Sequence, residues 1–233
     1  MLVFVHSKTK QKIKIMLHEI LPNQTVEAAA AQLATVAVGH EVQLTPAPTS
    51  ELSSTDQKTL LGTFNDMSSL RRNAPPRQPW ELAYSADIYV VTHGASVLRS
   101  AIAGFDSGKV SPALLLGITG EVLGAQRGGN DQAAHLAAMD KTGLLTSADR
   151  SIVEALANGI KHQWQTGGDD QQIMPNVSSL IGGALNRVGA DAPSSCALRL
   201  TLASMYAGAT AGSEFSDGAH NRLASVTAAL IVE

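Results

Sequence analysis

The chain has 233 residues, 44% of them hydrophobic and 16% charged, and its formal net charge is −3. This composition excludes a disordered chain, and it gives no overall electrostatic attraction to nucleic acid or to an anionic membrane, so we expect neither as a partner. The length fits one large domain over residues 1–233. With a lone cysteine, no signal-peptide pattern and no bilayer-length apolar run, we expect a cytoplasmic protein or one secreted by a leaderless route.

The first third of the chain predicts a strand, a helix and a second strand. Residues 12–17 and 41–44 have the pattern of short strands, and residues 25–38 place apolar side chains at helical spacing. Gly39 follows as a natural helix stop. This order is typical of a protein that alternates strands and helices.

Four lysines alternate along the N-terminal segment, at Lys8, Lys10, Lys12 and Lys14. In a strand, this period of two would place all four on one face. Such a face either binds a polyanion or prevents the edge of a sheet from pairing with another chain, and both alternatives stay open.

A strand that ends on a histidine is predicted at residues 86–93, where Ile, Tyr and Val dominate. Gly94 allows a sharp turn after His93, and the carboxyl edge of an α/β sheet is where ligands and chemistry collect. Residues 70–79 come before this strand and hold three arginines and three prolines, which predicts an extended, exposed loop.

The rest of the chain predicts five helices and one more strand. Ser111 and Pro112 form a cap and a first-turn proline, and Thr146 with Asp149 has the spacing of a capping box. The expected helices cover residues 111–117, 131–139, 146–160, 176–188 and 217–229, and the strand covers 198–203 with an exit loop at 205–212.

This order predicts an α/β fold in which helices flank a mostly parallel sheet. The separation between the two late strands is longer than a compact crossover needs. The excess falls at residues 123–168, which we interpret as a helical insertion within the single domain. Its histidines and aspartates match no metal-binding motif, so we expect no metal and no cofactor.

Four parts of the chain together resemble the caspase-like cysteine peptidases. They are the opening strand with its alanine-rich helix, the strand that ends at residues 92–94, the helix start at 109–116, and the late strand, loop and helix at 198–230. Within that superfamily the chain is most similar to the self-processing peptidase domains of bacterial toxins. The resemblance implies a caspase-like fold, a protein or peptide substrate, and a phosphorylated polyanion as activator, for which the four lysines are the candidate site.

The resemblance also assigns roles to three residues. His93 would be the base, Gly94 would donate its amide to the oxyanion, and Met205 occupies the position of the expected nucleophile. A thioether cannot be acylated, so the chain is either an inactive form or uses another nucleophile. Cys196 would lie about 30 Å from Met205 along a strand, and Ser204 would face the opposite side of the strand.

Two further interpretations remain open. The chain can be a non-catalytic interaction protein on a peptidase-like scaffold, with the insertion and the arginine-rich loop binding a partner. It can also be an unrelated hydrolase centred on Ser96, although no Gly-x-Ser-x-Gly motif is present.

Overall fold

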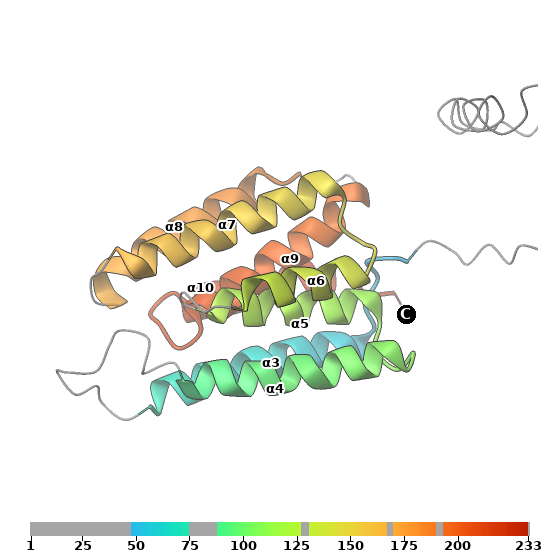
Figure 1. The fold of residues 1–233 in the computed structure, drawn as a ribbon, viewed down its shortest axis with the longest axis horizontal. Helices are drawn as coiled ribbons and strands as arrows, with labels where there is room; N and C mark the ends of the chain where they lie inside the picture. Colours follow the sequence, from blue (N-terminus) through green and yellow to red (C-terminus); the bar gives the residue numbers. More distant parts are fainter. Residues whose placement is uncertain (1–47, 75–87, 127–130, 167–169, 190–192, 233) are drawn as a thin grey trace, which may run out of the picture. The chain divides into compact units, whose positions relative to one another are not determined.

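The computed structural model describes residues 48–74, 88–126, 131–166, 170–189 and 193–232. The chain divides into two compact units, residues 1–47 and 48–233, and every described residue belongs to the second. This second unit contains eight described helices (Figure 1). They are α3 (Ser54–Arg72), α4 (Ile88–Asp106), α5 (Pro112–Ala125), α6 (Gln132–Lys141), α7 (Ser147–Gln165), α8 (Asp170–Arg187), α9 (Pro193–Thr210) and α10 (Ser216–Ala228).

The prediction of an α/β, caspase-like fold is wrong for the described part of the chain, which is helical. The predicted strand at 86–93 enters α4, and the predicted strand at 198–203 lies inside α9. Within the described ranges, β pairing is limited to one isolated bridge between Leu52 and Ile231. The elements expected at residues 12–17, 25–38 and 41–44, with the lysines from Lys8 to Lys14, lie outside the described residues.

The five predicted helices in the second half of the chain are confirmed. Ser111 caps α5 by accepting a hydrogen bond from the Leu114 amide at 3.1 Å, with Pro112 in the first turn. Thr146 and Asp149 form the expected capping box at the start of α7. These local signals were readable because each depends on neighbours a few residues apart.

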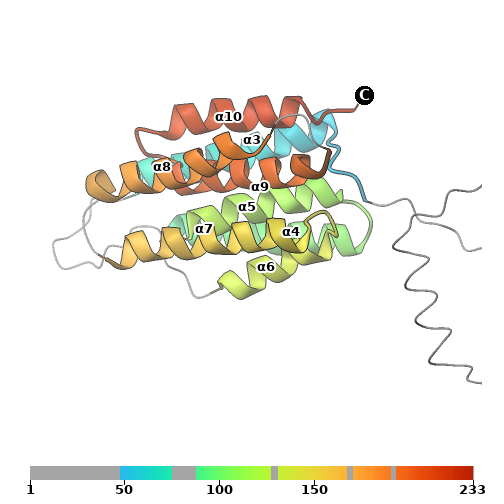
Figure 2. The same cartoon turned by 90° about the horizontal axis from the view of Figure 1, so that it is seen from above.

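The bundle is built around α5 and α9. Figure 1 shows α3 and α4 on one side of this pair and α7 and α8 on the other, and Figure 2 shows α6 and α10 at opposite edges. Every residue of α5 from Ala113 to Ala125 is buried. A helix that is apolar around its whole circumference belongs at the centre of a bundle.

Small residues bring α5 and α9 into backbone contact. A Cβ atom added at Gly208 would lie 2.7 Å from the carbonyl carbon of Glu121, and one added at Gly124 would lie 2.8 Å from that of Met205. A Cβ atom added at Gly120 would lie 2.9 Å from the Cβ atom of Ser204. Ser111, just before α5, donates to Asp56 in the first turn of α3, and Arg71 in the last turn of α3 donates to Ala211, just after α9, so α5 and α9 run in the same direction. We call this contact of Gly120, Glu121 and Gly124 with Ser204, Met205 and Gly208 the α5–α9 seam.

Residues 123–168, predicted as an insertion, comprise the end of α5, helix α6 and helix α7 within this bundle. Leu136 and Met139 of α6 and Val153 and Ile160 of α7 belong to the same buried cluster as the residues of α9. These helices therefore help to form the core. A search of the described helices identified none with the length and hydropathy needed to cross a membrane.

Candidate functional site

His93 and Gly94 lie in the first half of α4, not at the end of a strand. The His93 side chain is half-buried, and its Nε2 atom lies 3.9 Å from the carboxylate of Asp66 on α3. Gly94 packs against Val122 of α5. An amide inside a helix is committed to the carbonyl four residues earlier, so this position offers no obvious donor for an oxyanion.

Met205 is fully buried on α9, where its backbone contacts Gly124 of α5. Val122 and Gly124 are two residues apart, which corresponds to about 200° around a helix. Helices α4 and α9 therefore contact nearly opposite faces of α5. The structure does not bring His93 and Met205 together, because α5 lies between them.

The alternative nucleophiles are also separate from His93. Ser204 is fully buried beside Gly120 in the seam, and Ser96 is exposed on α4. Cys196, in the first turn of α9, lines a cavity of about 500 Å³ at the end of the bundle with Leu144, Thr146 and residues near the two ends of the described unit. Helical rise places Cys196 about 14 Å along the axis from Met205, where a strand would place it about 30 Å away.

The arginine-rich segment is only partly described. Arg71 and Arg72 form the last turn of α3, and Arg77 lies outside the described residues. The Arg71 guanidinium donates to the carbonyl oxygen of Ala211 at 2.5 Å, near the C-terminus of α9. A positive charge there satisfies a terminal carbonyl and complements the helix dipole, so Arg71 has a structural role.

A second pocket, of about 360 Å³, lies between the C-terminal end of α8 and helices α9 and α10. We call it the arginine pocket. Its lining residues are Leu185, Asn186, Val188, Gly189, Arg199, Arg222, Ser225 and Val226.

The lining of the arginine pocket is positively charged. Arg199 comes from α9 and Arg222 from α10, and neither acidic residue type occurs among the described lining residues. The Arg222 guanidinium donates to the side-chain oxygen of Asn186 at 2.5 Å, and this neutral acceptor leaves the charge of the arginine in place. The C-terminus of α8 adds roughly half a negative charge, which the guanidinium group of Arg222 outweighs.

Glu121 is the most unusual ionisable residue in the described chain. Its side chain is completely buried on α5, and neither carboxyl oxygen has a hydrogen-bond partner among the described residues. Burial away from water raises the pKa of Glu121 well above its ordinary value, because it disfavours the charged carboxylate. The Ser204 hydroxyl, also buried in the seam, likewise lacks a partner there.

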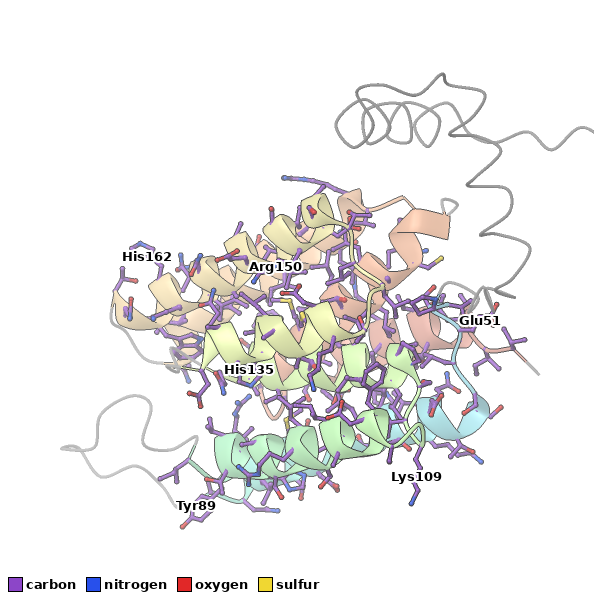
Figure 3. The ribbon with its side chains drawn as sticks, turned by 45° about the vertical axis from the view of Figure 1, so that its right-hand side comes forward. Glu51, Tyr89, Lys109, His135, Arg150 and His162 are labelled. Carbon is purple, nitrogen blue, oxygen red and sulfur yellow. The ribbon has the colours of Figure 1, made fainter. Side chains whose placement is uncertain are left out.

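Another buried polar pair near α5, His135 and Gln126, is bonded through its nitrogens, while the side-chain oxygen of Gln126 has no partner among the described residues. Figure 3 labels His135 on α6, whose Nδ1 atom lies 2.6 Å from the carbonyl oxygen of Asp131. Its Nε2 atom lies 3.2 Å from the side-chain nitrogen of Gln126, just after α5. In this arrangement Nδ1 donates to the Asp131 carbonyl oxygen and Nε2 accepts from the Gln126 amide. No metal-binding group of three or more ligands occurs in the described ranges.

The sequence analysis identified neither the arginine pocket nor the buried Glu121. Arg199 lies in a segment that was interpreted as a strand. Arg222 lies in a correctly predicted helix, but nothing in the sequence indicates that a second arginine from another helix lines the same pocket. Glu121 carried a readable signal, because it is the one acidic residue in the apolar run from residue 113 to 125. A charge inside such a run predicts either a buried functional group or a shifted pKa.

No protein-family model, curated protein or solved structure matches this chain.

Proposed function

We propose that the chain is a non-catalytic interaction module that binds an anionic group of a partner in the arginine pocket. The observation that carries the proposal is that two helices, α9 and α10, each contribute an arginine to one pocket whose described lining has no carboxylate. Guanidinium groups bind carboxylate and phosphate with paired, charge-assisted hydrogen bonds. The net charge of −3 makes this positive site local, which favours recognition of one group over general attraction to polyanions.

The lining also indicates which kind of chemical group the anion is attached to. Leu185, Val188 and Val226 contribute apolar surface next to the two arginines, and Ser225 adds a hydroxyl. The volume of about 360 Å³ exceeds what a single phosphate or carboxylate fills. The ligand we expect is therefore a carboxylate or phosphate attached to an apolar group, such as an acidic side chain beside a hydrophobic one on a partner protein.

The proposal is tested by titrating the full chain with phenyl phosphate and with benzoate, and by following backbone amide shifts by NMR. Both anions are expected to shift residues of α8, α9 and α10, and the stronger of the two identifies the preferred anion. Replacing Arg222→Gln removes a charge-assisted bond worth roughly 1.5–3 kcal/mol, so the dissociation constant should rise about tenfold or more. Added salt should weaken binding in the wild type.

Arg72→Gln is the matched control, because Arg72 is an exposed arginine in the last turn of α3, outside the pocket. It should leave the affinity for both anions unchanged. Benzyl alcohol supplies the apolar ring without the charge and should bind much more weakly. Equal affinity for benzyl alcohol, or an unchanged affinity in Arg222→Gln, would contradict the assignment of the pocket to an anion.

A further inference from the structure

The α5–α9 seam combines two features that oppose each other. Its glycines allow backbone contact between the helices, which leaves no space for water. Yet Glu121, whose own backbone is part of this contact, has a completely buried carboxyl group without a described partner. An unpaired carboxylate in such a place costs several kcal/mol, whereas a neutral carboxyl costs much less and has a proton to donate.

The helices packed against α5 bring few ionisable groups to the interior. Of the described residues, His135 on α6 and Tyr206 on α9 are the other buried ionisable side chains, and both are engaged, with Gln126 and with Ser178 respectively. The buried residues of α4 and α7 include none that ionise.

Half-buried basic side chains occur on the described helices nearby, and none of them bonds to Glu121. On α3, Arg71 reaches the Ala211 carbonyl, and on α4, His93 faces Asp66. Glu121 therefore has neither a hydrogen-bond partner nor a charge partner among the described residues.

We propose that the α5–α9 seam is a pH-dependent latch, closed while Glu121 carries its proton and loosened when that proton is lost. Ionisation creates a charge that must reach water, and movement of α5 away from α9, which meets the backbone of Glu121 at Gly208, exposes it. The glycine contacts make this separation costly, so the response is confined to conditions that ionise Glu121.

The direction of the effect follows from the linkage between protonation and folding. Because the pKa of Glu121 is raised in the folded chain, the contribution of its protonation to the free energy of unfolding is fully present below the unfolded-state pKa of about 4.3. That contribution is lost progressively as pH rises from this value toward the folded-state pKa. Over this window the folded chain holds up to one proton more than the unfolded chain. Each unit by which the pH rises therefore lowers the folding equilibrium constant by up to about tenfold.

The test measures hydrogen exchange along the full chain from pH 4.5 to 8, with each rate corrected for the intrinsic pH dependence of exchange. Protection of α5 and α9 amides should fall as pH rises, while protection of α7 stays constant. In Glu121→Gln, which is neutral at every pH, the protection of α5 and α9 should no longer depend on pH. Glu214→Gln removes an exposed carboxylate and serves as the matched control, with the wild-type pattern expected.

Two results would overturn the latch. Constant protection of α5 and α9 in the wild type would show that Glu121 does not control the seam. A uniform loss of protection over all described helices would show that ionisation of Glu121 unfolds the bundle as a whole instead of opening one contact. Because the wild type alone decides both points, the test does not depend on the folding of the variant.

Discussion

Gly208 determines how closely two central helices approach. Replacing Gly208→Ala would place a methyl group 2.7 Å from the carbonyl carbon of Glu121, in overlap with its carbonyl oxygen. Backbone atoms on both sides cannot yield as a side chain would, so we expect a loss of about 3 kcal/mol in the free energy of unfolding, at the upper end of overpacking costs. Urea denaturation of the wild type and the variant measures this difference.

Gly183 on α8 is the matched control for that substitution. A Cβ atom added there meets nothing within 4 Å, and the residue lies inside a helix. Gly183→Ala should therefore stabilise the bundle by roughly 0.5–1 kcal/mol, because alanine restricts the unfolded chain and favours the helix. If Gly183→Ala lowered the free energy of unfolding as Gly208→Ala does, the close contact at Gly208 would not be the cause of the loss in Gly208→Ala.

At the scale of helices, the sequence was misleading where a short window contained a second periodicity. Residues 88–93 are rich in β-branched and aromatic side chains, but the buried positions of α4 are Val90, Gly94, Leu98 and Ala101. That spacing of four, four and three residues is helical, and it is visible only when the window extends past Gly94. The strand prediction stopped at the glycine and missed it.

Helix α9 was misleading for a different reason. Leucines at 198, 200 and 202 alternate with Arg199 and Thr201, which imitates the period of a strand. In the structure Thr201 is also buried, and its hydroxyl donates to the carbonyl oxygen of Ala197 at 2.8 Å. A threonine that satisfies itself within its own helix can be buried on any side, so its polarity no longer marks an exposed face.

Helix starts, by contrast, were predictable because their signals are local. The capping box at the start of α7 allows the contribution of such a signal to be measured. The Thr146 hydroxyl accepts from the Asp149 amide at 3.2 Å, and the Thr146 amide donates to the Asp149 carboxylate at 3.1 Å. Thr146→Ala removes the first bond, and we expect a loss of about 1 kcal/mol in the free energy of unfolding. Thermal unfolding followed by circular dichroism measures it.

Helix α6 supplies the comparison for that cap. Asp131 occupies the same position before α6 but makes no side-chain capping bond. Asp131→Ala should change stability by no more than a few tenths of a kcal/mol, chiefly through the helix dipole. A loss equal to that of Thr146→Ala would contradict the assignment of the Thr146 effect to its capping bond.

At the scale of the whole bundle, the first and last described segments meet, a contact that local patterns do not reveal. The Leu52 amide donates to the carbonyl oxygen of Leu230 at 2.9 Å, and the Val232 amide donates to that of Leu52 at 3.1 Å. The pairing joins residues about 180 positions apart in sequence, so no spacing rule anticipates it. The arginine pocket escaped sequence reasoning for the same reason, since Arg199 and Arg222 approach only when α9 and α10 pack.

Deleting residues 230–233 removes both of these hydrogen bonds and uncovers Leu52, which is only 2% exposed in the intact bundle. Two backbone bonds contribute about 1–3 kcal/mol together, and partial exposure of a leucine adds about 1 kcal/mol more. We therefore expect a loss of roughly 2–4 kcal/mol in the free energy of unfolding, measured by urea denaturation. Deleting Glu233 alone keeps both bonds and should leave the midpoint unchanged. If the longer deletion also left it unchanged, the pairing of the two segments would contribute nothing to the stability of the bundle.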